Sequence, residues 1–475
     1  MKSIKQITPI EENFSKWYID VVTNGNLIEY GPVKGTIIFK PNSYGIWENI
    51  QIHFNKIIKK QGVRNVYLPM LIPAHLIAKE KNHVNGFAPE LATITKVGNK
   101  NLSEEIYIRP TSEVLFAEFF KSEINSYNDL PLAYNQWANV LRWEKTTNPF
   151  LRNSEFLWQE GHTCHVEKQE AEEMTMKMLE TYKVFLRDYL AIPVITGIKT
   201  ELEKFSGAES TFTIEAMMKD GKALQSGTSH FLGRNFSEIF NISYKSKENK
   251  PEFVYQTSWG ISTRLIGAII MTHGDNRGII IPPKIAPIQI DIIEIMADKE
   301  AQVGIISNNL AQELEDFYSI RIDKSKKSGG FKASQSEIEG VPVRIEIGPR
   351  EALNNEVIVV RRDTLEKTNV NISNIKKFVD DLMDSIQQNL LSSAEKRLKE
   401  NIIIVKSYEE LKESIKQNRF ALVPLIDKDE YELRIKEETT ATARCIPLEM
   451  KVPSTGICIF SGQKTNRFVI YAKSY

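Results

Sequence analysis

Two apolar segments in the first half of the chain, 136–143 and 155–165, carry more charge than an ordinary buried hairpin tolerates. The stretches 140–144 and 150–162 together contain two arginines, Arg142 and Arg152, and three glutamates among aromatic residues. Arginine and glutamate are seldom buried unless they are paired. We interpret the segments as two antiparallel strands joined by a loop, and their charge predicts a functional site rather than a plain core.

A nucleotide site in this chain would have to be built from arginines, because the sequence contains neither a Walker-type phosphate loop nor a glycine-rich dinucleotide fingerprint. The segment 257–267 passes from a strand into a helix that carries Arg264. An isolated helical arginine is commonly a surface ion pair, but the preceding Trp259 and Gly260 and the following 273–275 favour function. The segment 39–69 combines a turn, an amphipathic helix and a proline-containing strand, and a surface helix with an edge strand explains it about equally well.

The remaining pattern divides the chain into a large N-terminal part and two smaller units. Periodicity predicts helices at 14–30 (leading into a loop), 47–62, 112–124, 167–190, 234–240 and 261–272, and strands at 66–71, 91–97, 105–109, 210–217, 223–226 and 253–255. After Pro282, Pro283 and Pro287, predicted strands (288–295, 318–322, 341–347, 356–361) alternate with helices (299–317, 371–391) and a polar stretch at 323–334. From about residue 400 we expect a helix at 407–418 and strands near 420–425, 456–460 and 467–472.

Composition indicates the cellular compartment of the protein more clearly than its function. The three cysteines are odd in number and far apart, which argues against a disulfide framework and favours a reducing compartment. No apolar run approaches the roughly 18 residues that a membrane-spanning helix needs, so we expect a cytoplasmic protein without a membrane partner. The formal net charge of zero neither supports nor excludes a nucleic-acid partner.

Taken in order, the segments 39–69, 140–162 and 257–267 resemble the three motifs of class II aminoacyl-tRNA synthetases. The second closely resembles that of prolyl-tRNA synthetases of the archaeal and eukaryotic type, and 109–113, 203–207, 225–230 and 340–350 match the same family. The resemblance covers nearly the whole chain. It implies an α+β fold with a class II catalytic domain at 1–284, in which helices flank an antiparallel sheet. An α/β anticodon-binding domain at 285–395 and a small α+β C-terminal domain at 396–475 would follow.

The resemblance implies that the chain activates L-proline with ATP and magnesium to prolyl-adenylate and transfers it to the 3′ end of tRNA(Pro). Arg142 would be the catalytic clamp, holding the proline carboxylate and the α-phosphate; a guanidinium suits two anionic partners. The implied proline-binding residues are Thr111, Glu113, Arg142, Trp158, His162, Phe205, His230, Trp259 and Gly260. The implied ATP-binding residues are Arg142, Glu144, Arg152, Phe156, Gln225, Thr228, Ser262 and Arg264.

Further expectations concern the rest of the chain. Glu346 and Arg350 could read anticodon bases, and Lys332 with its neighbours could meet phosphates or form a solvated charge run. The family's usual Thr and Arg are replaced by Asn153 and Ser154. We expect no bacterial-type editing insertion and, with only Cys458 of a four-cysteine set present, no zinc site. The first motif implies a homodimer.

Two rival functions remain at this point. A class II synthetase of other specificity, such as threonyl, is disfavoured by the pocket residues and by the lack of a Cys/His/His zinc set. A catalytically silent paralogue that only binds tRNA is disfavoured because Arg142, Arg152 and Arg264 are all present.

Overall fold

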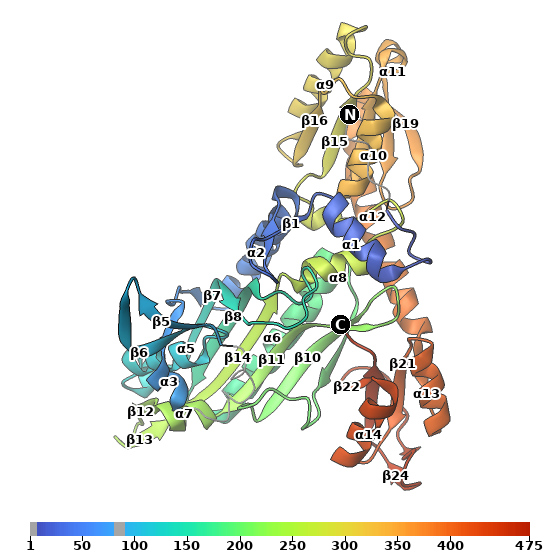
Figure 1. Ribbon diagram of the computed structural model, residues 1–475. Coiled ribbons are helices and arrows are strands. Elements are labelled where there is room, and N and C mark those ends of the chain that lie inside the picture. Colours follow the sequence, from blue (N-terminus) through green and yellow to red (C-terminus); the bar gives the residue numbers. More distant parts are fainter. Residues whose placement is uncertain (1–6, 80–90) are drawn as a thin grey trace.

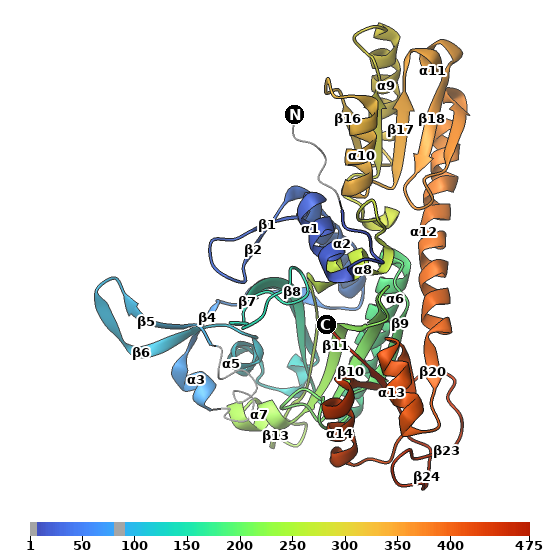
Figure 2. The same ribbon diagram turned by 45° about the vertical axis from the view of Figure 1, so that its right-hand side comes forward.

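The computed structural model describes residues 7–79 and 91–475. Figures 1 and 2 show a large body built on a sheet, an α/β lobe above it (yellow to orange) and a C-terminal unit (red) beside the sheet. Helix α12, Ile375–Glu400, runs from the upper lobe down to the C-terminal unit (Figure 2). The arrangement confirms the predicted α+β fold class with its three parts.

Eleven described strands form one sheet in the order β20-β21-β25-β22-β9-β10-β11-β14-β8-β7-β3. Their bounds are β3 Arg64–Asn65, β7 Leu132–Leu141, β8 Glu155–His165, β9 Val194–Ile198, β10 Ser210–Met217, β11 Ala223–Gly233, β14 Tyr255–Ser262, β20 Ile402–Ile404, β21 Phe420–Pro424, β22 Thr442–Pro447 and β25 Phe468–Ala472. The strands from β9 to β7 are antiparallel. The two charged segments predicted as paired strands, at 136–143 and 155–165, correspond to β7 and β8, which pair with Val140 opposite Phe156. We call these two strands the charged ribbon.

The main core lies where helices α2 (Pro41–Lys60), α6 (Lys168–Leu190) and α8 (Arg264–His273) meet this sheet. Helix α2 begins with Pro41 at its first position, where the missing N–H is harmless. Its apolar residues recur at helical spacing and are buried; Phe54 stacks on Tyr182 of α6 at 5.3 Å between ring centroids. Helix α1 (Phe14–Asn24) packs against α8. The helices predicted at 47–62 and 167–190 are therefore confirmed.

The upper lobe is a five-stranded sheet in the order β16-β15-β17-β18-β19. Its elements are β15 Ile290–Glu294, α9 Ala301–Leu314, β16 Ile320–Asp323, α10 Gly329–Glu339, β17 Val343–Ile347, α11 Pro349–Asn354, β18 Glu356–Arg361 and β19 Lys367–Asn371. Strands β16, β15 and β17 are parallel, whereas β18 and β19 are antiparallel. The alternation predicted after Pro282 is confirmed, but the polar stretch 323–334 contains the start of α10, where the Ser328 hydroxyl accepts from the Phe331 N–H.

Smaller elements surround the main body. They are β1 Ile28–Tyr30, β2 Ile37–Phe39, β4 Leu71–Pro73, α3 Ala74–Ala78, β5 Thr93–Val97, β6 Lys100–Ile108, α5 Glu113–Glu123, α7 Asn235–Phe240, β12 Ser243–Lys245 and β13 Pro251–Phe253. The C-terminal unit adds α13 Tyr408–Lys416, α14 Asp429–Thr439, β23 Gly456–Ile457 and β24 Lys464–Thr465. Among the described residues, no helix is both long and apolar enough to span a bilayer.

Several element predictions are wrong. The helix predicted at 14–30 ends at Asn24, and Ile28–Tyr30 form strand β1 instead. Residues 66–70 are not a strand, although short strands β3 and β4 flank them. The Leu68 N–H donates to the Gln136 side chain and its carbonyl accepts from Arg109, so buried side chains replace a strand partner. The helix predicted from residue 261 begins at Arg264 because β14 continues through Ser262. Helix α12 continues through residue 395 and ends at Glu400.

Candidate functional site

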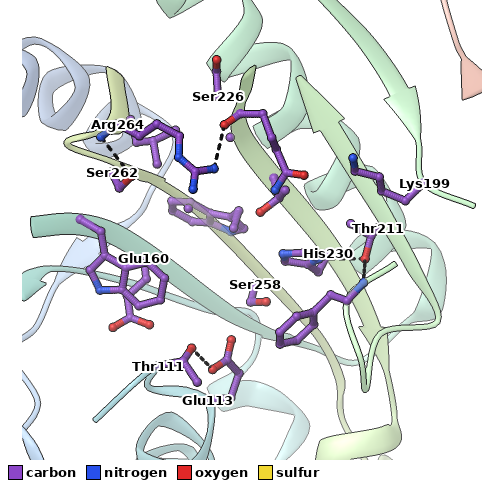
Figure 3. A pocket seen from close by; sticks show the side chains of 18 of the residues that line it. Thr111, Glu113, Glu160, Lys199, Thr211, Ser226, His230, Ser258, Ser262 and Arg264 are labelled. Carbon is purple, nitrogen blue, oxygen red and sulfur yellow. Dashed lines mark hydrogen bonds between the residues drawn. The ribbon is translucent and has the colours of Figure 1, made fainter. Parts of the chain in front are cut away.

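A cavity of about 330 Å³ opens over strands β8, β10, β11 and β14 and the start of α5 (Figure 3). This volume lies at the lower end of the range for small-molecule sites. Alternate residues of a strand share a face, and on β8 these are Phe156, Trp158, Glu160 and His162, all of which line the cavity. The cavity therefore sits on the charged ribbon that the sequence singled out.

Arg142 follows directly after β7 and enters the cavity wall from one side. Its Nε donates to the carbonyl of Pro110 at 2.9 Å, and its guanidinium lies 5.3 Å from the ring centre of Phe156 and 5.5 Å from that of Trp158. Burial lowers the pKa of Arg142, and the carboxylates of Glu113, Glu160 and Glu144 partly offset that shift. The aromatic faces and the Pro110 carbonyl hold the guanidinium in one place.

Arg264, the first residue of α8, reaches the same cavity from the opposite strands. Its guanidinium donates to the carbonyls of Leu151 and Gln225, each at 3.2 Å. Burial, and then the nearby positive charges of Arg142 and Arg152, lower the pKa of Arg264 to about 10. Three arginines close enough to repel one another create a positive region that favours an anionic ligand.

The opposite end of the cavity is acidic. Thr111 Oγ1 donates to the Glu113 carboxylate (Figure 3), and Glu113 is the first residue of α5. A second carboxylate, Glu160, accepts from Ser112 Oγ and Gln136 Nε2, both at 2.5 Å. Buried carboxylates that are hydrogen-bonded in this way remain suited to a cationic group of a ligand.

Arg109 supports this acidic end without lining the cavity. It is fully buried and donates to the carbonyls of Asn139 and Leu68 and to the Asn139 side chain. The segment 109–113 is thereby tied to β7 and to the irregular stretch after β3. Arg109 is a scaffold for Thr111 and Glu113.

Aromatic rings lie beneath the cavity and around its remaining sides. Trp259 pairs with Gly161 on the core face of the sheet, and an added Cβ on Gly161 would meet the indole at 2.1 Å. His162 stacks on Phe116 at 4.0 Å between ring centroids. Across the cavity, the Phe205 ring lies 4.7 Å from that of His230, and His230 Nδ1 shares a 3.0 Å hydrogen bond with Thr211 Oγ1. The cavity thus combines a small apolar compartment with charged ends.

Two polar atoms of this wall, Ser258 Oγ and Trp158 Nε1, have no hydrogen-bond partner among the described residues. Unpaired buried polar atoms are costly and are uncommon in folded proteins. These two atoms therefore mark places where a ligand or water completes the hydrogen bonding.

The structure brings most of the predicted site residues together. All nine predicted proline-binding residues line the cavity, and so do Phe156, Gln225, Thr228, Ser262 and Arg264 of the ATP set. Glu144 lies near enough to Arg142 to affect its pKa, and Arg152 occupies the turn between β7 and β8 and is exposed; neither lines the cavity. Further lining residues are Glu160, Lys199, Glu203, Thr211, Ser226, Gly227, Ser258 and Ile261. Strand alternation would have found Glu160 and Ser258, whereas Lys199 carried no local signal.

Asn153 and Ser154, which replace the family's usual residues, are both buried. The Ser154 N–H donates to the Gly35 carbonyl at 2.8 Å, and the Ser154 carbonyl accepts from the Arg142 N–H at 2.7 Å. A Cβ on Gly35 would come within 2.3 Å of Ser154 Oγ, so this corner is tightly packed. The Ser154 main chain thus fixes the backbone of Arg142.

The predicted anticodon residues lie in the upper lobe, at β17 and the helix that follows it. Arg350 is exposed in α11. Glu346 is 7 % exposed, and its carboxylate pairs with Arg344 at 2.8 Å and with Lys367 at 3.1 Å. Lys332 is buried and donates to the carbonyls of Glu294 and Asp323, so it does not face phosphates as we expected.

Comparison with known protein families supports this geometry. Residues 95–273 match the class II core domain of the tRNA synthetases for G, H, P, S and T, and residues 285–382 match an anticodon-binding domain. Residues 408–475 match the C-terminal domain of prolyl-tRNA synthetase. The fold and the cavity thus define a class II aminoacyl-tRNA synthetase.

Individual relatives narrow the class further. The chain is 60% identical to a proline–tRNA ligase of Mycoplasmopsis pulmonis and 49% identical to one of Mesoplasma florum, in both cases over 100% of both chains. It also matches the crystal structure of prolyl-tRNA synthetase from Cryptosporidium parvum complexed with halofuginone and AMPPNP, with a TM-score of 0.95, 38% identity and full coverage of both chains. The chain belongs to the proline–tRNA ligase family.

Proposed function

We propose that this cavity activates proline with ATP and that the residues assigned from the sequence perform the step. The chain is a proline–tRNA ligase: it forms prolyl-adenylate and transfers the prolyl group to tRNA(Pro), with tRNA, proline and ATP as substrates. The rival specificities lose their support because full-length relatives are proline–tRNA ligases. What remains to be assigned is the role of each side chain.

One observation carries the assignment: Thr111 and Glu113 lie across the cavity from Arg264 (Figure 3), and Arg142, which is near enough to Glu113 to feel its charge, lines the same cavity. Proline is a zwitterion with a secondary ammonium, which needs two acceptors, and the Thr111–Glu113 pair offers a hydroxyl and a carboxylate. The proline ring would fill the space between Trp158, His162 and Phe205, and its carboxylate would face Arg142. The orientation of proline follows from charge alone.

ATP would occupy the arginine end. Arg142 would contact the α-phosphate beside the attacking carboxylate, so that two mutually repelling anions meet on one guanidinium. Arg152 would hold the terminal phosphate, and the adenine would lie between Phe156 and Arg264 by stacking and cation–π contact. Catalysis of this kind rests on positioning and on preorganised charge. AMPPNP in the Cryptosporidium enzyme is an ATP analogue, which fits this use of the cavity.

Magnesium would bind together with ATP, and the oxygen donors near the cavity fit a magnesium ion that is held mainly by the nucleotide. No group of three metal-ligating side chains occurs in the described residues. The carboxylate of Glu144 and the amide oxygen of Gln225 are oxygen donors of the type that magnesium accepts. Magnesium usually keeps several waters and phosphate oxygens as ligands, so few protein ligands suffice. When bound, it would neutralise charge on the phosphates.

Binding of tRNA(Pro) would use the upper lobe. We propose that Arg350, which is exposed, reads a base edge, and that Glu346 does so when its ion pairs with Arg344 and Lys367 open. The exposed Arg350 and the ion-paired Glu346 should respond differently to substitution. We expect Arg350→Ala to raise the KM for tRNA, and Glu346→Gln to affect both tRNA binding and the stability of the upper lobe. If neither substitution alters the KM for tRNA, the anticodon assignment is wrong.

A homodimer is the assembly that we propose. Exposed large apolar residues gather on the first motif and beside it, and they are Tyr30, Val33, Ile38, Tyr44 and Ile52. Exposed apolar patches of this kind mark interaction sites. Light scattering after gel filtration would show about twice the 54.4 kDa chain mass for the wild type, and a smaller mass for Ile52→Glu. A wild-type chain that elutes at monomer mass would contradict the proposal.

Other features of the proposal concern subtype and setting. Residues between the second and third motifs form α6, strands β9 to β11 of the central sheet, helix α7 and the small hairpin β12–β13, which supports an enzyme without the editing insertion. In the C-terminal unit, Tyr431 and Phe460 stack at 4.7 Å near Cys458, which supports the absence of zinc. We propose a cytoplasmic location, and domain limits near residues 284 and 395.

The amino-group assignment is tested most cleanly at Glu113. Glu113→Gln removes the charge but keeps the size, and it should raise the KM for proline at least about tenfold, the effect of losing a charge-assisted hydrogen bond. The KM for ATP should stay the same. Glu118→Gln, on the same helix but paired outside the cavity with Lys79, is the control. If Glu113→Gln leaves the KM for proline unchanged, the orientation of proline is wrong.

A further inference from the structure

We propose that Arg444, from the C-terminal unit, positions the active-site residue Arg264 through Glu215 and the main chain of Gln225. Arg444 does not line the cavity, so it would act as a positioning residue and not as a catalytic one. The inference rests on the proposed function of the cavity, in which Arg264 contacts ATP. It makes the C-terminal unit a part of the ATP site.

A buried ionic cluster is the first element. Glu215 on β10 is completely buried, and its Oε2 accepts from Arg444 Nε at 3.0 Å and from Arg444 Nη2 at 2.9 Å. Its Oε1 accepts from Lys199 Nζ and Thr213 Oγ1, both at 2.9 Å. Burial alone would raise the pKa of Glu215, but Arg444 and Lys199 outweigh it and lower the pKa. Glu215 is therefore a charged anchor whose Oε2 depends on Arg444.

The sheet register connects this anchor to the cavity. Glu215 lies directly opposite Gln225 of β11, next to a bulge that leaves Ser226 without a partner residue on β10. Bulges re-aim the side chains and main chain beside them and are frequent near active sites. The Gln225 carbonyl accepts from Arg264 Nη1 at 3.2 Å. A shift of Glu215 would thus be passed to the group that holds the Arg264 guanidinium.

The C-terminal unit is attached to the same sheet. Strand β22 pairs with β9, Ile446 with Ile198 and Pro447 with Gly197, and β9 in turn pairs with β10. Gly197 permits this approach, because a Cβ there would lie 2.4 Å from the Cβ of Cys445. Arg444 immediately precedes Cys445, so the pairing of β22 with β9 fixes the position of Arg444 between the C-terminal unit and the central sheet.

The chain end holds β11 as well. The Ala223 N–H donates to the Lys473 carbonyl at 2.8 Å, and the Tyr475 N–H donates to the Ala223 carbonyl at 3.2 Å. Ala223 is the first residue of β11, two residues before Gln225. The C-terminal unit therefore contacts the start of β11 and, through Arg444 and Glu215, the position of its bulge.

The two substrates should respond differently to loss of Arg444. Thr111 and Glu113 follow β6, whereas Glu215 lies on β10 and Arg444 on β22. When Arg444 is replaced, Glu215 Oε1 keeps its bonds to Lys199 and Thr213. Only the bonds of Oε2 would be lost, at the residue that pairs with Gln225 in the sheet. We therefore expect the ATP subsite to weaken while the proline subsite is preserved.

The test compares Arg444→Met with Arg444→Lys in the full-length chain. ATP–pyrophosphate exchange with proline would give a KM for ATP about tenfold higher in Arg444→Met, the effect of losing hydrogen bonds to a charged group. Arg444→Lys, which keeps one charged donor, would recover to within about threefold of the wild type. The KM for proline would change by less than about twofold in both. Arg434→Met, an exposed arginine of the same unit paired with Glu438, is the matched control.

Three results would overturn the proposal. The first is an unchanged KM for ATP in an Arg444→Met protein whose circular dichroism spectrum matches the wild type. The second is a parallel rise of the KM values for ATP and proline, and the third is a loss of active enzyme with both KM values unchanged. A purely structural role would produce the second or the third result. If Arg444→Met does not fold, the same comparison is made with Arg444→Lys and Arg444→Gln. A wild-type chain without proline-dependent exchange would instead refute the proposed function itself.

Discussion

Adding a single carbon at Gly161 tests the packing under the active site. Gly161 is paired with Trp259 in the register of β8 and β14, and an alanine Cβ would lie 2.1 Å from the indole. Ordinary contact is 3.4 Å or more, so the ring or the strand must move by about 1.3 Å. Trp259 is 2 % exposed and packs towards Tyr182 of α6, which leaves little space for this movement.

Overpacking of a dense core typically costs about 1–3 kcal/mol, and we expect Gly161→Ala to lower the free energy of unfolding by that amount. Gly161 also lies between Glu160 and His162, whose side chains line the cavity. A displaced strand should therefore raise the KM for proline. Urea denaturation measures the first effect, and ATP–pyrophosphate exchange measures the second.

The matched control is Gly330→Ala in helix α10, where an added Cβ meets no atom within 4 Å. Alanine is the better helix residue, so this variant should be neutral or more stable by up to about 1 kcal/mol. If Gly161→Ala unfolds at the same urea concentration as the wild type and keeps its KM for proline, the packing argument is refuted.

Two further predictions concern the contacts at the end of helix α8. The side chain of Arg362 is 2 % exposed and binds Asp275 bidentately, so Arg362→Met should lower the free energy of unfolding in urea by about 2–4 kcal/mol. The control Arg277→Met, at an exposed arginine, should lower it by less than about 1 kcal/mol. Equal losses of stability in the two variants would contradict the importance of the buried ion pair. Burial lowers the pKa of His273 to about 3, and the ring bonds the Leu190 carbonyl. In the unfolded chain the ring takes up a proton near pH 6.5, so the free energy of unfolding should fall as the pH drops from 6.5 towards 3. His273→Gln should lose less stability than the wild type over that range. An identical pH dependence of stability in the two proteins would refute the burial argument.

Local sequence patterns predicted most of the charged ribbon. Strand β8 has the predicted bounds, and alternation along it places Phe156, Trp158, Glu160 and His162 on one face. Strand β7, predicted at 136–143, spans Leu132–Leu141. Helices α2 and α6 followed from apolar spacing because their buried stripes are long. The sequence therefore predicted the position of a side chain where the periodicity of its own strand or helix determines that position.

Contacts between distant segments could not be predicted in this way. The stretch 66–70 looked like a strand, but its backbone is satisfied by Gln136 and Arg109, which lie far along the chain. Helix α10 was hidden by the two glycines at its start, although Ser328 caps it. Glu215 and Arg444 are separated by 229 residues, and only the sheet that joins the two units brings them together.

The central claim is that this cavity activates proline and that Arg142 is its clamp. The most direct measurement is ATP–pyrophosphate exchange with each of the twenty amino acids in turn, on the wild type and on Arg142→Ala. We predict strong exchange with proline and a loss of at least about a hundredfold in Arg142→Ala, since a preorganised charged donor is removed from the transition state. Strong exchange with another amino acid, or an Arg142→Ala variant as active as the wild type, would contradict the account.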